Sequence, residues 1–200
     1  MLTRHLPLLL LALLASCAST TFSSTWKAPD VGRIDYAGKK VAAVFIGPDA
    51  SARRAAEDRL ATELDALGAD GVAAYTVVDD AALADQGQAR ARLLAAGFDG
   101  AVVLRITDKE ERLRSSPELY TGYRYSSFSA YSGWGFGATY PVRLETDTIV
   151  VVETLVYRLS EDKILWGGVS RTFNPSKLDA LIEELCAAVW KELEAEGLVN

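Results

Sequence analysis

The chain has 200 residues, with 21 Lys and Arg against 27 Asp and Glu, which gives a formal net charge of −6. This acidic balance excludes the basic surface that nucleic-acid binding requires. Half of the residues are apolar and 24% are charged, so the chain can build a packed core rather than remain disordered. The one histidine, His5, lies in a segment that we expect to be cleaved, which excludes histidine-dependent triads, dyads and zinc sites from the mature protein.

Residues 1–16 have the pattern of a secretory signal peptide. A short basic segment precedes an apolar run over residues 6–15, which is far shorter than the roughly 20 residues of a membrane-spanning helix. The run ends in Leu14-Ala15-Ser16-Cys17, and this tetrapeptide resembles the lipobox of bacterial lipoproteins. The resemblance implies cleavage before Cys17, a diacylglycerol group on its sulfur and an acylated new amino terminus, with palmitate among the acyl chains.

A lipid on Cys17 would tether the protein to a bacterial membrane. Each buried methylene contributes about 0.8 kcal/mol, so several acyl chains anchor a protein almost irreversibly. Position 18 is Ala, where an Asp would resemble a retention signal for the inner membrane, and this analogy favours the outer membrane with the protein facing the periplasm. Lipidation leaves Cys186 without a disulfide partner, and its helical spacing from Ile182 and Val189 predicts a small buried apolar side chain.

The segment after the lipobox differs in composition from the rest of the chain. Residues 17–38 are rich in Ser, Thr, Gly and Pro, and we expect a lipidated amino terminus with a flexible tether there. Trp26 is the exception. A solvated linker would leave its large apolar ring exposed to water, so we expect Trp26 to pack on the domain. The folded domain is expected over residues 39–200.

The first half of that domain alternates predicted strands and helices. Short apolar runs predict strands at residues 41–46, 72–78 and 101–106, the last continuing into a charged stretch at 108–114. Periodic apolar positions predict one helix that is capped by Asp49 or Ser51 and ends at Gly68, and another over residues 86–96 that ends at Gly97. Right-handed crossovers would make the three strands parallel.

The second half predicts an antiparallel hairpin and a final helix. A β-rich run at residues 142–159, a turn at Glu161-Asp162 and a run at 163–173 form the hairpin. Asn174-Pro175-Ser176 offers the cap for the last helix. One apolar stripe would bury this helix on a sheet, and it comprises Leu178, Leu181, Ile182, Leu185, Cys186, Val189 and Leu193.

The predicted fold class is α/β, with an α+β tendency: one mixed sheet in the order β-α-β-α-β-β-β-α, covered by helices. Residues 39–47, Arg53-Arg54 with Glu57-Asp58, Ala74-Tyr75, residues 97–105, Leu165-Trp166 and Phe173-Asn174-Pro175 carry a resemblance. Over about residues 25–198 the pattern resembles the α/β domain at the amino terminus of TolB, in the curli secretion lipoprotein CsgG and in other envelope lipoproteins. The resemblance implies the fold and assigns no catalytic or binding residue.

An aromatic, Ser/Gly-rich insertion is expected at about residues 115–141, where charge is almost absent. It holds eight of the 18 aromatic residues of the chain, and long loops of this kind are usually functional or disordered. Three interpretations remain open: an insertion folded on its own domain, a recognition loop for an envelope partner, and a membrane hairpin in a ring, which the CsgG resemblance implies. Poor alternation weakens the third. The candidate partner-binding residues are Tyr120, Tyr123, Tyr125, Phe128, Tyr131, Trp134 and Phe136.

Two groups of charged residues could carry chemistry or contacts. Arg53 with Glu57 and Arg54 with Asp58 have i, i+4 spacing, which predicts a solvated salt-bridged face or, alternatively, a docking surface. Asp79, Asp80 and Asp99 lie at or beside predicted strand ends, where open α/β sheets often place their sites. Adjacent Asp side chains more often cap loops and helices, so no catalytic, cofactor-binding or metal site is predicted.

The function predicted from the sequence is that of a lipid-anchored envelope lipoprotein. We expect a non-catalytic binding or assembly component in the periplasm, with the membrane and an envelope protein as partners and homo-oligomers as an option. One alternative is a subunit of an oligomeric outer-membrane secretion assembly. Another is a carboxylate-dependent hydrolase on envelope glycans, which would need two of the three Asp carboxyls to converge beside a cleft.

Overall fold

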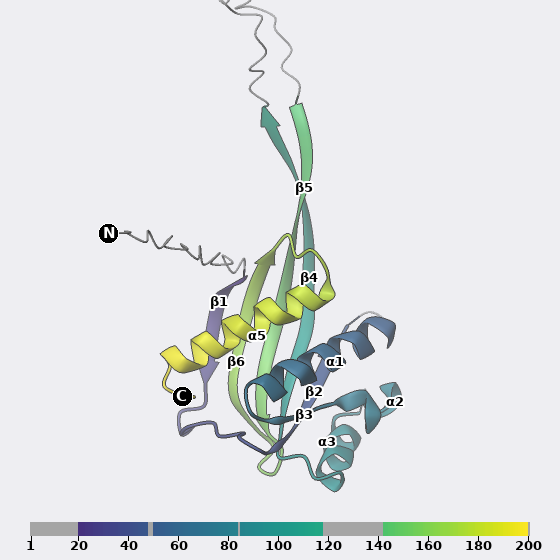
Figure 1. The fold of residues 1–200 in the computed structure, drawn as a ribbon, viewed down its shortest axis with the longest axis vertical. Helices are drawn as coiled ribbons and strands as arrows, with labels where there is room; N and C mark the ends of the chain where they lie inside the picture. Colours follow the sequence, from purple (N-terminus) through teal and green to yellow (C-terminus); the bar gives the residue numbers. More distant parts are fainter. Residues whose placement is uncertain (1–19, 48–49, 84, 118–141, 200) are drawn as a thin grey trace, which may run out of the picture.

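The computed structural model describes residues 20–47, 50–83, 85–117 and 142–199, which form one mixed sheet with helices on both faces (Figure 1). The strands are β1 (Thr20–Lys27), β2 (Lys40–Ile46), β3 (Asp70–Ala73), β4 (Gly100–Pro117), β5 (Val142–Arg158) and β6 (Lys163–Phe173). The helices are α1 (Ala50–Ala66), the 3-10 turn η1 (Ala74–Thr76), α2 (Asp80–Leu83), α3 (Gln86–Ala95) and α5 (Leu178–Ala195). The predicted α/β class is confirmed.

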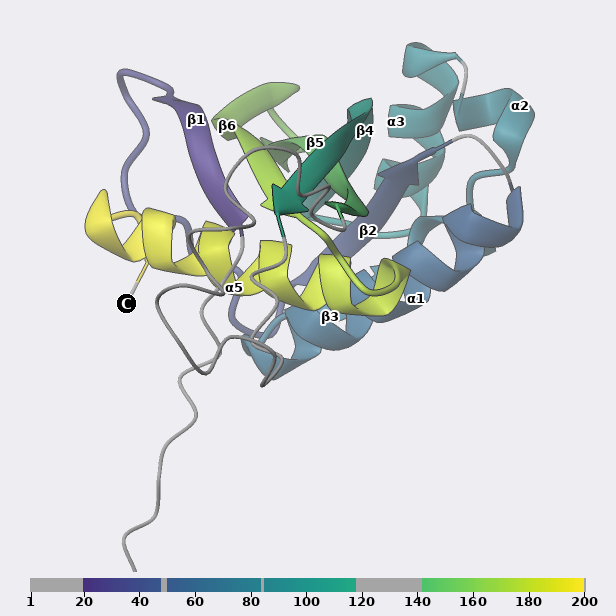
Figure 2. The same cartoon turned by 90° about the horizontal axis from the view of Figure 1, so that it is seen from above.

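The strands of the sheet lie in the order β1-β6-β5-β4-β2-β3. β2 is parallel to both β3 and β4, as the crossovers predict, and the remaining neighbours are antiparallel. Helices α1 and α5 lie side by side over one face, whereas α2 and α3 lie over the opposite face at the β2–β3 end (Figure 2). Glycine residues end both crossover helices as expected, since Gly68 and Gly97 have φ values of +88° and +80°.

The expected tether is partly wrong, because residues 20–27 form the edge strand β1. β1 pairs antiparallel with β6, the hydroxyls of Thr20 and Thr172 lie 2.7 Å apart, and the Phe22 ring meets Trp166 edge-on at 5.6 Å between centroids. The connection to β2 is also docked, because Ile34 N donates to the carbonyl of Leu198. The prediction for Trp26 is wrong as well, since this side chain is 53% exposed on β1.

Two further boundaries differ from the sequence prediction. The second predicted strand, residues 72–78, is only β3, because the chain turns into η1, where the Thr76 hydroxyl donates to the Ala73 carbonyl. The last helix begins at Leu178 with Lys177 as its N-cap residue, and neither Asn174 nor Ser176 caps it. Asn174 instead has a φ of 48°, and its side-chain oxygen accepts a hydrogen bond from Thr148 N on β5.

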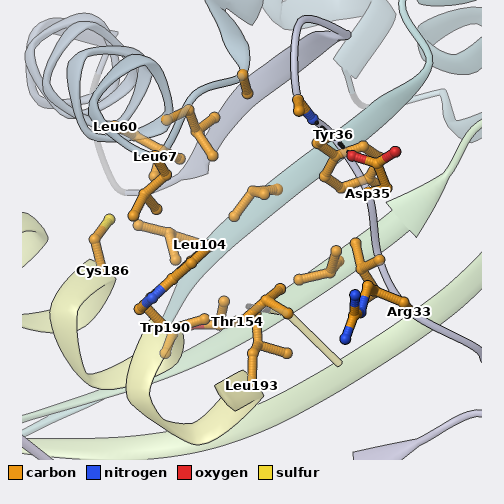
Figure 3. A pocket seen from close by; sticks show the side chains of 18 residues that line it. Arg33, Asp35, Tyr36, Leu60, Leu67, Leu104, Thr154, Cys186, Trp190 and Leu193 are labelled. Carbon is orange, nitrogen blue, oxygen red and sulfur yellow. Dashed lines mark hydrogen bonds between the residues drawn. The ribbon is translucent and has the colours of Figure 1, made fainter. Parts of the chain in front are cut away.

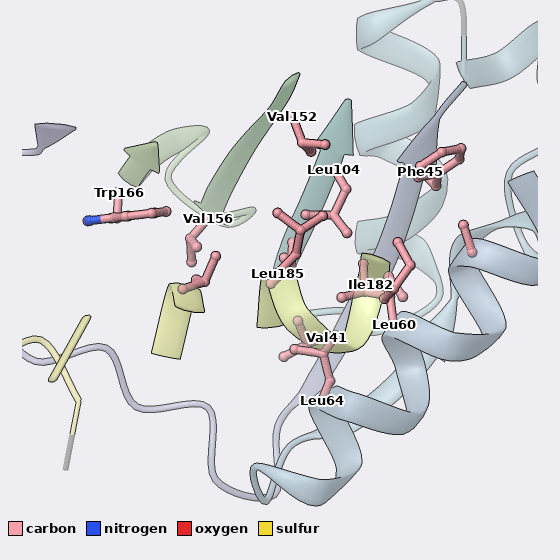
Figure 4. Close-up of a cluster of buried hydrophobic side chains, with 14 of the residues drawn as sticks. Val41, Phe45, Leu60, Leu64, Leu104, Val152, Val156, Trp166, Ile182 and Leu185 are labelled. Atoms are coloured by element: carbon pink, nitrogen blue, oxygen red, sulfur yellow. The ribbon is translucent and has the colours of Figure 1, made fainter. Parts of the chain in front are cut away.

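The main core lies between the sheet and helices α1 and α5 (Figure 4). The stripe predicted for the last helix faces inward, where Ile182 and Leu185 are buried against Leu60 of α1 and Leu104 of β4. Trp166 of β6 is completely buried at the other end of this layer. The second face of β2 and β4 packs a smaller cluster under α2 and α3, centred on Val44, Leu93 and Phe98.

Truncating the central side chain of α5 tests this packing. Because Ile182 is fully buried, Ile182→Ala is expected to lower the free energy of unfolding by about 2–5 kcal/mol, measured by urea denaturation. Leu67→Ala at the end of α1 is the control, since Leu67 is 41% exposed and its loss should change stability by less than about 1 kcal/mol. Equal effects of the two substitutions would contradict the assignment of α5 to the core.

Candidate functional site

The residues predicted to bind a lipid and a partner lie outside the described residues. These are Cys17 and the seven aromatic side chains Tyr120, Tyr123, Tyr125, Phe128, Tyr131, Trp134 and Phe136. The structure does describe the strands that flank the aromatic segment. β4 runs as far as Pro117 and β5 begins at Val142, so residues 115–117 belong to a strand rather than to the predicted insertion.

The two strands form a ribbon that leaves the sheet, which we call the β4–β5 arm (residues 107–117 and 142–148). β4 and β5 pair continuously from Gly100 opposite Arg158 to Pro117 opposite Val142, apart from one register shift between Ile106 and Asp108. The other neighbour of β4 stops at Arg105, and the other neighbour of β5 stops at Ile149. Beyond these points the strands pair only with each other, and the ribbon rises away from the helices (Figure 1).

The register shift lies at the base of the arm. Thr107 is left unpaired there, and its hydroxyl donates to the carbonyl of Val151. A bulge of this kind bends a strand and increases its twist, which redirects the residues beyond it. The change of direction and the loss of neighbouring strands therefore occur at the same point of the chain.

Charged side chains cover the described part of the arm. Asp108, Lys109, Glu111 and Arg112 are exposed on β4, and charge on an unpaired edge opposes edge-to-edge aggregation. Glu110 accepts hydrogen bonds from Arg112 on its own strand at 2.6 Å and from Arg171 of β6 at 3.4 Å. The Arg112 hydrogen bond is the main cause that lowers the pKa of Glu110.

Of the two charged pairs on α1, Arg54 and Asp58 are exposed as predicted, whereas Arg53 and Glu57 are not part of a solvated face. Arg53 is 7% exposed and Glu57 is fully buried, with Arg53 Nε 2.8 Å from Glu57 Oε1. The same carboxylate accepts hydrogen bonds from Phe45 N at 3.2 Å and Tyr75 N at 2.6 Å. Arg53 also donates to the Val78 carbonyl at 2.8 Å and pairs with Asp80. This pair therefore joins β2, α1 and the chain after β3.

The three Asp residues of the hydrolase hypothesis do not converge. Asp79 accepts from Ala82 N at the start of α2 and from Arg92, and these two contacts lower its pKa. Asp80 pairs with Arg53 at the carboxyl edge of the parallel strands, whereas Asp99 immediately precedes β4 at the opposite edge. The two adjacent acids thus serve local structure. Within the described ranges no group of three metal-binding side chains comes together, and no helix there is long and apolar enough to cross a membrane.

A cavity of about 460 Å³ lies between α1, α5, the sheet and the segment before β2. Figure 3 shows Leu60 of α1 and Leu67, which directly follows α1, facing Trp190 and Leu193 of α5 across the cavity, with Leu104 on its floor. Sequence reasoning missed this cavity, because its walls come from elements that are far apart in the chain. Apolar spacing on each helix was the only signal, and it predicted a closed core.

Two polar groups on the cavity wall are held in an apolar environment. Tyr36 donates its phenolic proton to the Tyr157 carbonyl, and burial raises the pKa of Tyr36 to about 12. Burial likewise raises the pKa of the Cys186 thiol to about 12, consistent with the predicted role of this residue as an apolar side chain.

The similarity of this chain to known proteins is limited to the path of the backbone. Neither a protein-family model nor a curated protein sequence matches this chain. Among solved structures, a PelC dodecamer from Paraburkholderia phytofirmans is 14% identical with a TM-score of 0.47, over 85% of this chain and 94% of that chain. The lipoprotein GNA1162 from Neisseria meningitidis is 14% identical with a TM-score of 0.41, over 79% of this chain and 99% of that chain.

Removing the cation of the buried pair tests its role. Arg53→Met leaves the buried Glu57 carboxylate uncompensated, and we expect the free energy of unfolding to fall by about 3–5 kcal/mol. Arg59→Met is the matched control on the same helix, because Arg59 is 32% exposed and pairs with Glu63 and with the exposed Glu183 of α5, and its removal should cost less than about 1 kcal/mol. Urea denaturation of both variants measures the difference, and similar losses would show that burial adds nothing to the Arg53 pair.

Proposed function

We propose that the protein is a lipid-anchored lipoprotein of the bacterial envelope that acts as a non-catalytic binding or assembly component in the periplasm. The β4–β5 arm is the single observation that carries this proposal. It carries the ends of two strands, Pro117 and Val142, away from the core, and the aromatic segment lies between these two residues in the sequence. Lipid on Cys17, with palmitate among its chains and the outer membrane as the favoured location, is the anchor in this proposal.

Physical reasoning supports a partner for the arm. A two-stranded ribbon is marginally stable in water, and the described arm gains no third strand from the sheet. Aromatic side chains set among small residues suit adaptable contacts, because they give a large contact area at a low entropic cost. The domain gives the β4–β5 arm few stabilising contacts. A bound protein would supply the contacts that are missing.

Shortening the arm separates docking from folding. Arg112 and Asp147 face each other in register, so residues 113–146 can be replaced by Asn-Gly, which favours a two-residue hairpin turn. This keeps the contacts of Glu110 with Arg171 and of Asn174 with Asp147. We expect the free energy of unfolding to change by less than about 1 kcal/mol, while cross-linking of the lipidated protein in intact envelopes loses its partner band.

A second variant keeps both strands and replaces the seven aromatic residues Tyr120, Tyr123, Tyr125, Phe128, Tyr131, Trp134 and Phe136 by Ser. Loss of the partner band in this variant would assign the contact to the aromatic side chains. A band at a multiple of the mass of this chain would favour the alternative, a subunit of an oligomeric outer-membrane assembly. A shortened variant that folds and keeps every cross-link would overturn the role of the arm.

The anchor is tested independently of the arm. Mass spectrometry of the protein from envelopes should show cleavage before Cys17 and an added diacylglycerol group, and Cys17→Ser should block processing or release the protein from the membrane. An unmodified Cys17 in the mature protein would remove the anchor from the proposal.

A further inference from the structure

The cavity between α1 and α5 is separate from the arm and has features of a ligand site. Its volume of about 460 Å³ falls in the range of small-molecule sites. Its inner wall is formed by apolar side chains of both helices and of β4 and β5, among them Leu64, Val102, Val156 and Val189. Water gains few hydrogen bonds in such a cavity, whereas an apolar chain would fill it favourably.

A buried hydroxyl on the floor of the cavity lacks a partner. Thr154 lies on β5 with 0% exposure, and no described atom forms a hydrogen bond with its Oγ1. Figure 3 shows its side chain among those that line the cavity. A buried polar group without a partner is costly to keep, and an occupant whose oxygen reaches this hydroxyl would supply the missing partner.

A cation without a partner lies at the rim. Arg33 is exposed and lines the cavity, and no described residue forms a hydrogen bond or an ion pair with its guanidinium group. The nearby Asp35 carboxylate is already engaged by Ala37 N. The segment 33–36 also borders a smaller cavity of about 200 Å³ that is lined by Lys39 and Arg158 together with Asp99. The larger cavity alone has one cation and one carboxylate at its rim, Arg33 and Asp35, and the two cavities together have three cations and two carboxylates.

We propose that this cavity binds one single-chain amphiphile: a fatty acyl chain with an anionic head and an oxygen on the chain close to the head. The chain occupies the space between α1 and α5, the head pairs with Arg33, and the oxygen forms a hydrogen bond with the Thr154 hydroxyl. A guanidinium group suits a carboxylate, because it can donate two parallel hydrogen bonds. Arg33, Thr154 and the apolar walls then each recognise a different part of the same ligand.

Three probes distinguish these contributions in titrations of the purified full-length protein: β-hydroxydodecanoate, dodecanoate and dodecanol. We expect affinity to decrease in that order, by about tenfold at each step, because each step removes one hydrogen-bonding or ionic contact. Arg33→Gln should weaken both acids about tenfold and leave dodecanol unchanged. Thr154→Val, which keeps the shape of the side chain, should weaken β-hydroxydodecanoate to the level of dodecanoate and leave dodecanoate unchanged.

Trp190 reports whether the ligand occupies this cavity, since its ring lines the wall. A brominated dodecanoate should quench tryptophan fluorescence, and Trp190→Phe should remove most of that quenching while retaining affinity within a few-fold. Thermal unfolding controls for folding, and Thr154→Val should not lower the melting temperature because it removes a hydroxyl without a partner. The absence of binding by all three probes, affinities that do not respond to Arg33→Gln and Thr154→Val, or quenching that persists without Trp190 would overturn the proposal.

Discussion

The buried carboxylate of Glu57 is the interaction on which the arrangement of the parallel half depends. Its two oxygens accept hydrogen bonds from the backbone of Phe45 at the end of β2 and of Tyr75 in η1, and from Arg53 one turn earlier on α1. A charge in this position is tolerated only because each of its neighbours donates to it. The same contacts end β3 after four residues and fix α1 over the sheet.

The position of α1 in turn determines where α5 can lie. The two helices share one face of the sheet, and their apolar stripes meet in the layer of Leu60, Ile182 and Leu185. They close tightly there and leave the cavity beside their carboxyl-terminal halves. The arm is a consequence of the other half of the sheet, because β4 and β5 continue after β2 and β6 have stopped pairing. β4 and β5 therefore belong to the sheet over one part of their length and form the projecting arm over the rest.

Much of this fold could be predicted from local patterns in the sequence. The bounds of β6, the glycine ends of α1 and α3, the parallel strands and the inward stripe of α5 were all predictable, because burial and backbone conformation leave a local signal. β1 could not be predicted from the sequence, since a Ser/Thr-rich edge strand has little alternation of apolar and polar residues. The Arg53–Glu57 pair was misassigned because i, i+4 spacing is the same on a buried and on a solvated face. The cavity has no local signature at all.

Amide hydrogen exchange tests most directly the claim that the domain does not support the arm and that a partner does. In the purified protein, amides of residues 108–116 and 143–148 are expected to exchange at least about tenfold faster than those of residues 100–105 and 150–156, which have strands on both sides. In protein held in its native envelope, the difference should shrink as the arm gains protection. An arm that is protected as strongly as the sheet in the purified protein would contradict this account.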